Sequence, residues 1–290
     1  MTKTSPAPSS APAGAIEIMP MTAEHLPQAL SLSQDVQWPY RIEDWEVAFG
    51  LGHGFAAEKD GELVGTALWW PYAPDFATAG MIIVSEKVQR RGIGARLMEA
   101  LLSDAGERRV VLNSTAEGQK LYLGTGFEPY SIVLQHQAVL SRAPEVDPSV
   151  PLRNAEAKDD DAILAIDRAG AGMGRAALIN AMREGAETLV VYRGEGVTGY
   201  GVVRRWGRGV VVGPVVAEDA DDARALIAAL AGRHVGTFVR IDVTESCGLA
   251  PWLETLGLPR AGRVVTMALG KPPEPDSSAT LFALANQSLG

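Results

Sequence analysis

The chain alternates between short apolar runs and amphipathic stretches, and each kind of stretch predicts one kind of element. Residues 15–19, 54–70 and 81–84 read as strands, and the Lys-Asp-Gly turn at 59–61 divides the second run into two. Residues 23–34, 42–51 and 93–102 carry apolar side chains at helical spacing, with Ile93, Leu97 and Leu101 on one face. A strand at 109–115, a helix at 121–125 and a strand at 131–140 follow.

The second half of the chain repeats this order of elements. Strands at 151–157, 188–206, 209–216, 239–245 and 263–270 alternate with helices at 160–170, 176–185, 220–232 and 251–256. Strands that alternate with helices in each half predict an α/β (α+β) layered fold built twice. We therefore expect one domain at 15–140 and a second at 151–270.

Three segments fall outside this pattern. Residues 1–14 hold Pro, Ser, Ala, Thr, Gly, Met and one Lys, too little apolar surface to offset the entropy of ordering, so we expect a disordered tail. The Pro-bearing stretch at 141–150 reads as an interdomain linker. The polar run at 271–278 and the short apolar end after it make 271–290 a C-terminal tail.

Composition narrows the class of protein. The chain has 290 residues, a length that favours two domains, and its formal net charge of −9 opposes binding to the phosphate backbone of nucleic acids. The single cysteine, Cys247, excludes an internal disulfide and a multi-cysteine metal site, and it fits a reducing cytoplasm. No metal-ligand spacing links the histidines, and no apolar run reaches the length of a membrane span. We expect a cytoplasmic protein without metal, nucleic acid or membrane partners, a monomer or a homodimer.

The segment QRRGIGA at 89–95 carries the clearest chemistry. Gly92 and Gly94 remove side chains at the point where the helix begins, and the first amides of a helix have no partners within it. The helix dipole adds partial positive charge there, and three arginines (Arg90, Arg91 and Arg96) add formal charge. The pattern predicts a seat for a diphosphate, bound by the amides of residues 91–95.

The two commonest phosphate motifs do not fit this segment. Position 97 is Leu where the dinucleotide fingerprint needs a third Gly, and the Gly-Lys-Ser/Thr of nucleoside-triphosphate loops is absent. With its preceding strand and following helix, QRRGIGA resembles the acetyl-coenzyme A motif of the GNAT N-acetyltransferase superfamily. The segment LNSTAEGQKLYLGTGF at 112–127 resembles that superfamily's later strand and its helix ending in Leu-Tyr-x-x-x-Gly-Phe. The order of elements in both halves is similar to a tandem GNAT protein.

The resemblance implies a splayed, mixed sheet in each domain and acetyl-coenzyme A as cosubstrate. The backbone of Ile82, Ile83 and Val84 would pair with the pantetheine arm and the acetyl group, and residues 89–96 (Gln89, Arg90, Arg91, Gly92, Ile93, Gly94, Ala95 and Arg96) would hold the diphosphate. Tyr122 matches the family's tyrosine near the sulfur. When an amine attacks the thioester a thiolate leaves, and a nearby phenol can protonate it, so Tyr122 is the candidate general acid. The alternative for Tyr122 is an aromatic that only packs the helix on the sheet.

The general base and the acceptor are less defined. Glu86, Asp75 and His53 are candidate bases, a solvated surface role is the alternative for each, and a water chain could replace a single base. Trp38, Tyr40 and Tyr72 stand where the superfamily usually binds its acceptor, and aromatic faces can line a pocket and hold a cation. Core filling is the alternative, and it suits Trp45 and one of Trp69 and Trp70, because alternation buries one of two neighbours.

The second half lacks the features that carry chemistry in the first. Opposite QRRGIGA stands AEDADDA at 217–223, whose carboxylates would repel a diphosphate, and Leu253 stands opposite Tyr122. We therefore expect a degenerate second domain. The leading hypothesis is an acetyl-coenzyme A-dependent N-acetyltransferase acting on a small-molecule amine. A coenzyme A sensor or partner-binding scaffold, O-acetylation and a longer acyl donor remain alternatives.

Overall fold

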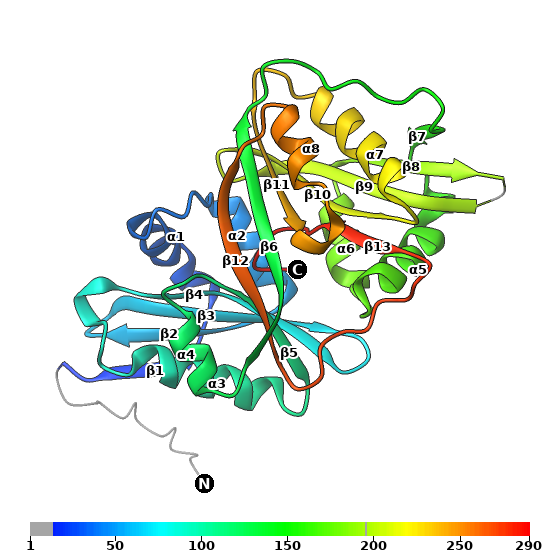
Figure 1. Cartoon of the computed structure of the whole chain (residues 1–290). Helices are drawn as coiled ribbons and strands as arrows, with labels where there is room; N and C mark the ends of the chain where they lie inside the picture. The colour runs from blue at the N-terminus through cyan, green and yellow to red at the C-terminus, as the bar shows by residue number, and fades with distance from the viewer. Residues whose placement is uncertain (1–13, 195) are drawn as a thin grey trace, which may run out of the picture.

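The computed structural model describes residues 14–194 and 196–290, so residues 1–13 of the expected tail lie outside the described residues (Figure 1). The helices and strands of the first half are β1 (Ile16–Pro20), α1 (Leu26–Asp35), α2 (Ile42–Leu51), β2 (His53–Lys59), β3 (Glu62–Tyr72), β4 (Phe76–Val84), α3 (Ile93–Ala105), β5 (Arg109–Ser114), α4 (Gln119–Gly124) and β6 (Glu128–Val139). Short 3-10 helices at Ala23–His25 and Glu86–Val88 join them.

The second half repeats this order and adds one strand. Its elements are β7 (Leu152–Asn154), α5 (Asp160–Ala171), α6 (Ala176–Arg183), β8 (Glu187–Arg193), β9 (Gly196–Trp206), β10 (Gly209–Ala217), α7 (Ala220–Gly232), β11 (Phe238–Thr244), α8 (Ala250–Thr255), β12 (Arg260–Leu269) and β13 (Thr280–Ala283). The duplicated α/β architecture expected from the sequence is confirmed.

The two halves share one sheet because they exchange strands. The order of strands is β1-β2-β3-β4-β5-β12-β6-β11-β13-β10-β9-β8-β7. The strand β12 of the second half therefore pairs with β5 of the first, and β6 of the first half pairs with β11 of the second. Figure 1 shows β6 and β12 running between the two halves of the molecule.

Side-chain burial explains why the exchanged strands stay in place. Val265, Met267 and Leu269 of β12 pack into the apolar core beneath α3 and α4 of the first half. Leu134 of β6 packs into the core beneath α7 and α8 of the second half. Each half therefore completes its core with a strand of the other, which fixes the two halves against each other.

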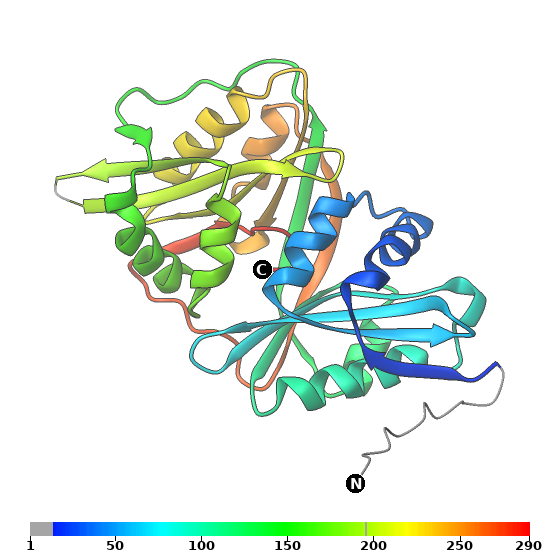
Figure 2. The same cartoon turned by 180° about the vertical axis from the view of Figure 1, so that it is seen from behind.

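Helices cover both faces of the sheet in each half. In the first half α1 and α2 pack on one face and α3 and α4 on the other, and α5 and α6 lie opposite α7 and α8 in the second (Figure 2). Trp69 and Trp70 are consequently both buried, one in each layer. The expectation that only one of them would be buried was wrong, since a sheet covered on both faces buries successive residues.

In both halves two neighbouring parallel strands separate partway along their length. The strands β4 and β5 pair from Phe76 and Arg109 to Ala79 and Leu112, and residues 80–84 have no partner on that side. We call the space beside residues 80–84 the first notch. In the second half β10 and β11 pair only at residues 210–211 and 239–240, and we call the space beyond them the second notch.

The segment 271–290 differs from the expected C-terminal tail. Residues 280–283 form β13, which lies in the second notch between β10 and β11, and residues 284–290 are buried except for the partly exposed Gln287. The reason is tertiary. The backbone of the apolar run at 281–285 supplies hydrogen-bond partners for the open edge of β10. No local pattern in the sequence indicates that this edge lacks a partner.

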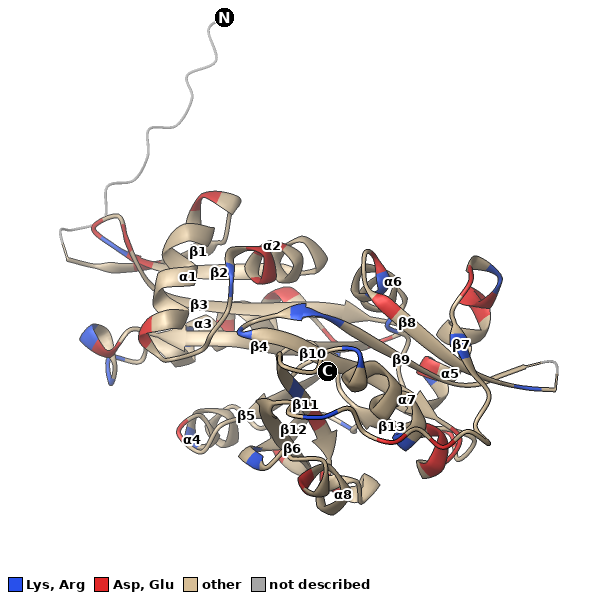
Figure 3. Cartoon of the chain, turned by 90° about the horizontal axis from the view of Figure 1, so that it is seen from above, with Lys and Arg blue, Asp and Glu red and all other residues tan. Residues whose placement is uncertain are grey.

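Charged residues of both signs are scattered over both halves of the molecule (Figure 3). Within the described ranges, no helix combines the length and the hydropathy needed to cross a membrane. The same residues contain no group of three His, Cys, Asp or Glu side chains placed to hold a metal ion.

Candidate active site

The first notch begins at a bulge in β4. The register between β3 and β4 shifts between Thr66 and Leu68, and Met81 in β4 adopts a left-handed backbone with a φ of 51°. The Thr66 hydroxyl donates a hydrogen bond to the Met81 carbonyl, 2.7 Å away, and holds the bulge from the neighbouring strand. A bulge of this kind redirects backbone groups, and this one lies beside residues 80–84, where β4 has left β5.

The helix α3 begins at the outer end of the first notch. Gly92 at its N-cap has a φ of 75°, and among the described residues no side chain caps this terminus. A Cβ at Gly92 would meet nothing within 4 Å, whereas one at Gly94 would lie 3.2 Å from Leu121. The first amides of α3 are consequently unobstructed, as the sequence predicts, and the partial positive charge of the helix terminus faces open space.

A large pocket of about 1120 Å³ joins the first notch to the second half of the molecule. It brings together most of the residues singled out in the sequence, namely Trp38, Tyr40, Ile82, Ile83, Val84, Glu86, Gln89, Arg90, Gly92, Ile93, Gly94, Ala95 and Tyr122. The proposed diphosphate seat, the strand edge, the tyrosine and two of the three acceptor candidates therefore share one space.

Two of the predicted coenzyme residues do not line this pocket. The Arg96 guanidinium donates to the Ile16 carbonyl at 2.9 Å and so points toward β1. Arg91 is exposed and lies outside the pocket lining. Of the three arginines near the helix start, only Arg90 lines the pocket, and it does so from a left-handed backbone with a φ of 63°.

Three other candidates also lie away from the pocket. Asp75 forms an ion pair with Arg109 at 2.8 Å in the turn before β4. Tyr72 is buried and donates a hydrogen bond to the Leu289 carbonyl at 2.6 Å. His53 stacks on Trp69 with its ring centroid 4.5 Å away and lies beside Asp104. The structure therefore does not bring Asp75, Tyr72 or His53 to the candidate site.

Tyr122 lies on α4 with its ring packed edge-on against Phe127, 6.0 Å between centroids. Burial raises its pKa from the usual 10 to about 12. The phenol is therefore protonated at every physiological pH and is available as a hydrogen-bond donor. Tight packing holds the ring, because a Cβ on Gly118 would lie only 2.8 Å from it.

The far wall of the pocket combines residues of the second half with residues of β6, the strand that the first half contributes. Arg240 on β11 extends toward Asp242 two residues on, with Nε and Nη2 within 2.9 Å of one carboxylate oxygen. Gln135 on β6 lies beside this pair, and its amide oxygen, when turned toward Arg240, is 2.8 Å from Nε. Gln137 and Arg263 line the same wall. This hydrogen-bonding surface is assembled by the exchanged strands.

The remaining wall is formed by Gln287, Ser288 and the α1–α2 loop. The Tyr40 hydroxyl is 3.0 Å from the Ser288 hydroxyl, and the Tyr40 ring packs edge-on against Trp206, 5.9 Å between centroids. Gln287 donates to Asp242 at 3.1 Å. Burial raises the pKa of Tyr40, so this phenol is also protonated at neutral pH.

Sequence reasoning missed the residues of these two walls, although a signal for some of them exists. Polar side chains interrupt apolar strands at Gln135 and Gln137 and again at Arg240 and Asp242. A polar residue inside a buried strand costs free energy unless it is hydrogen-bonded, so such positions often serve a site. The role of residues 287–288 has no comparable local signal.

The second notch differs from the first at every corresponding point. β13 pairs with β10 at residues 215–217 and with β11 at Val243, so chain already fills the space. At the start of α7 the Asp219 carboxylate accepts hydrogen bonds from the amides of Asp221 and Asp222, each 2.9 Å. On α8, Leu253 is buried at the position where the sequence comparison sets it opposite Tyr122.

Comparison with family models agrees with this geometry. A model described as an acetyltransferase (GNAT) domain matches residues 50–129, and a second model of the same description matches residues 163–283. The chain belongs to the GNAT acetyltransferase superfamily, carries two GNAT domains, and is an acyltransferase of the N-acetyltransferase type.

Two curated relatives align along almost the whole chain. An uncharacterized N-acetyltransferase, YitH of Bacillus subtilis, is 24% identical over 94% of this chain and 98% of its own length. The holothin acyltransferase of a Pseudoalteromonas species is 28% identical over 87% of this chain and 93% of its own length.

Solved structures share the fold. A putative acetyltransferase from Pyrococcus horikoshii superimposes with a TM-score of 0.81 at 20% identity, over 98% of this chain and 99% of that one. A tandem GNAT protein from the clavulanic acid biosynthesis pathway has a TM-score of 0.64 at 15% identity, over 88% of this chain and 98% of that one. At these identities the likeness concerns the arrangement of elements.

Proposed function

We propose that the protein transfers an acetyl group from acetyl-coenzyme A to a small-molecule amine at one site, in the first notch. The observation that carries this proposal is the contrast between the two notches. The first is open and ends at an uncapped helix with glycines at its start, whereas the second is occupied by β13 and ends at a helix capped by Asp219. A second, degenerate domain then serves as a wall of the acceptor pocket.

The coenzyme fits this space from its diphosphate inward. The amides at residues 92–95 would bind the diphosphate, with Arg90 beside them, because helix termini and guanidinium groups both attract phosphate. The pantetheine arm would lie along residues 82–84 and take the place of the missing β5 pairing. The thioester would then lie near the Met81 bulge, at the inner end of the notch.

The transfer step needs two groups beside the thioester. The amine nitrogen attacks the thioester carbon, a C–N bond forms, and the C–S bond breaks to release coenzyme A as a thiolate. Tyr122 would donate a hydrogen bond to the leaving sulfur. Because burial raises the pKa of Tyr122 to about 12, while a thiol has a pKa of about 8.5, the phenol stabilises the thiolate mainly through this bond and full proton transfer is unfavourable.

The ammonium proton of the acceptor has to leave through the pocket. Glu86 lines the pocket, but it lies five residues beyond Met81, and a strand rises about 3.3 Å per residue, so roughly 15 Å separates it from the thioester. We propose that water carries the proton to solvent, with Glu86 as its outer acceptor. Asp75 is not part of this proposal because Arg109 holds it elsewhere.

The pocket wall favours one kind of acceptor. Arg240, Gln135 and Gln137 offer several hydrogen-bond donors, and Arg208 and Arg263 line the pocket without an ion-pair partner among the described residues. Asp35, Glu86 and Glu117 also line the pocket, but on this wall a polycation would meet guanidinium groups, whereas an amine that also bears a carboxylate or a comparable anionic group would be attracted. The aromatic pair Tyr40 and Trp206 would cover its apolar part.

Two measurements test the proposal. Calorimetry with acetyl-coenzyme A is expected to give one site per chain. Thiol release is then followed with a panel that contains amino acids, neutral primary amines and polyamines, and we expect turnover with the first group above the last. Binding without turnover on the whole panel would favour a coenzyme sensor, and failure to bind would refute the proposed site.

A further inference from the structure

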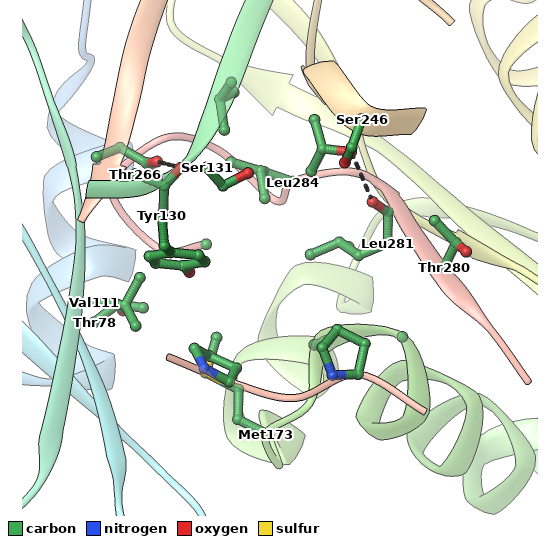
Figure 4. A pocket seen from close by; sticks show the side chains of 18 of the residues that line it. Thr78, Val111, Tyr130, Ser131, Met173, Ser246, Thr266, Thr280, Leu281 and Leu284 are labelled. Atoms are coloured by element: carbon green, nitrogen blue, oxygen red, sulfur yellow. Dashed lines mark hydrogen bonds between the residues drawn. The ribbon is translucent and has the colours of Figure 1, made fainter. Parts of the chain in front are cut away.

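A second cavity, of about 480 Å³, lies between the two halves behind the candidate site. Figure 4 shows Thr78 and Val111 of the first half on one side of it, Met173 and Leu281 of the second half on the other, and the Tyr130 ring projecting into it. Its lining is chiefly aliphatic side chains and hydroxyl groups, and among the described residues that line it Asp276 has the one charged side chain. Such a space suits an apolar group.

This cavity and the large pocket have three lining residues in common, Leu112, Asn113 and Ser288. Leu112 is the last β5 residue paired with β4, so the shared wall stands at the inner end of the first notch. These three residues are therefore the partition that separates the end of the proposed pantetheine channel from an apolar chamber.

The partition is held firmly by hydrogen bonds. The Asn113 amide donates to the Gln287 carbonyl at 2.8 Å, and its oxygen accepts from the Thr266 hydroxyl at 2.8 Å. The Ser288 hydroxyl is 3.0 Å from that of Tyr40. Ser288 also packs on the bare backbone of Gly80, where a Cβ would lie 2.8 Å from the serine Cβ, 2.9 Å from its Cα and 3.1 Å from its carbonyl oxygen, so both side chain and backbone of Ser288 close this point. Gly80 and Ser288 thus fit together at the point where β4 leaves β5.

We propose that Ser288 limits the length of the acyl group that the enzyme accepts from coenzyme A. The inference rests on the proposed coenzyme site in the first notch. An acetyl group ends in front of the partition, whereas a chain of six or eight carbons would meet Ser288 and Asn113. Removing the Ser288 side chain would join the notch to the 480 Å³ cavity, whose aliphatic lining would receive the extra methylenes.

The test compares the affinities of acetyl-, butyryl-, hexanoyl- and octanoyl-coenzyme A for the full chain by calorimetry. For the unmodified protein we expect octanoyl-coenzyme A to bind at least tenfold more weakly than acetyl-coenzyme A. For Ser288→Gly we expect that difference to disappear or reverse, since each methylene that enters the cavity contributes up to about fourfold in affinity. Ser141→Gly, at an exposed position of the linker, is the matched control.

Two further variants keep the test decisive. Ser131→Phe, added to Ser288→Gly, fills the cavity and is expected to remove the gain in octanoyl-coenzyme A affinity while acetyl-coenzyme A still binds. If Ser288→Gly does not fold, Ser288→Ala provides the same comparison at butyryl-coenzyme A, with a smaller gain expected.

The outcomes separate this inference from the proposed function. Equal affinity of the unmodified protein for all four donors would overturn the role of Ser288, and so would an unchanged ratio in a folded Ser288→Gly protein. Loss of acetyl-coenzyme A binding by the unmodified protein would instead overturn the coenzyme site itself.

Discussion

The two notches have the same origin in the fold and opposite surroundings. In each, a parallel strand pair separates and a helix begins at the outer end. In the first half the strand edge and the helix terminus are both open. In the second half β13 pairs with the strand edge, and Asp219 caps the helix. The comparison shows that a duplicated domain can keep its architecture while its own chain fills the space between the separated strands.

The unpaired amides at the starts of α3 and α7 have different surroundings. The amides of the first turn have no partners within the helix and favour an anion. In α7 the anion is the Asp219 carboxylate, whereas in α3 the residues of the first turn offer none and glycines leave room for a ligand. A helix start without its own cap, next to an open strand edge, is therefore the feature that distinguishes the first half from the second.

The largest effect is expected when the start of α3 is given a carboxylate, as the start of α7 has. Gly92→Glu adds a carboxylate at the proposed diphosphate seat and strains a backbone with a φ of 75°, so the affinity for acetyl-coenzyme A should fall at least 100-fold. Gly185→Glu is the matched control, because Gly185 is exposed, has a φ of 66° and has nothing within 4 Å of its Cβ position. Unchanged affinity measured by calorimetry would place the coenzyme elsewhere.

A smaller effect is expected from removing the Tyr122 hydroxyl, a group that the second half lacks because Leu253 stands at the corresponding position. Tyr122→Phe keeps the packing and removes one hydrogen bond to a charged sulfur, a loss of about 1.5 to 3 kcal/mol, so kcat should fall about 10- to 100-fold while the Kd of acetyl-coenzyme A stays the same. Thiol release with the best amine of the panel measures this change. Tyr192→Phe, at an exposed site of the second half, is the control, and full activity of Tyr122→Phe would refute the role of the phenol.

Removing the cap of the second half should affect stability alone. Asp219→Ala leaves two amides of α7 without an acceptor and is expected to lower the free energy of unfolding by about 1 kcal/mol, measured by urea denaturation. Because β13 still fills the second notch, the variant should gain no second coenzyme site. Asp221→Ala is the control, since the Asp221 carboxylate is exposed and pairs with Arg224 on the surface. A stoichiometry of two would contradict the closed second notch.

The smallest effect concerns pH. The proposed role of Tyr122 requires its protonated form, and burial raises its pKa to about 12, so this contribution should persist as the pH rises past about 10, where an ordinary tyrosine would lose its proton. With an acceptor amine whose own pKa lies below about 7, and which is therefore deprotonated throughout, kcat should stay level from about pH 8 to 10.5. A decline with a midpoint near pH 10 that Tyr122→Phe lacks would show that the phenol is not shielded from solvent.

Much of the candidate site could be predicted because its parts are local. The glycines of QRRGIGA act through the backbone of one turn, and the apolar face of Ile93, Leu97 and Leu101 is a property of one helix, so the structure confirms that helix over Ile93–Ala105. Tyr122 could be predicted for the same reason, because the strand and helix of its motif are adjacent in the sequence. The contributions of Arg91 and Arg96 could not be judged in this way, because a side chain on a helix start can point to the seat or to a neighbouring strand.

The far wall of the pocket could not be predicted, because its residues are brought together from distant parts of the chain. Arg240 and Ser288 are more than a hundred residues from the notch in the sequence. Gln135 reaches the pocket only because β6 and β12 are exchanged between the halves. Strand alternation marks which side chains share a face, and it is silent on which strand lies next to which. For Asp75, the position in the turn before β4 is compatible with a role in the site, but in the structure its carboxylate pairs with Arg109 instead.

The sequence by itself determined the duplicated order of elements, the glycines at the start of α3 and the carboxylates that stand at the start of α7, since these depend on propensity, periodicity and backbone freedom within short segments. Only the tertiary structure decided that the halves exchange strands, that residues 280–283 fill the second notch, and that Ser288 stands at the end of the first. Such long-range pairings depend on which open strand edges and apolar faces meet in the folded chain, and that is settled by the burial and hydrogen bonding of the whole molecule.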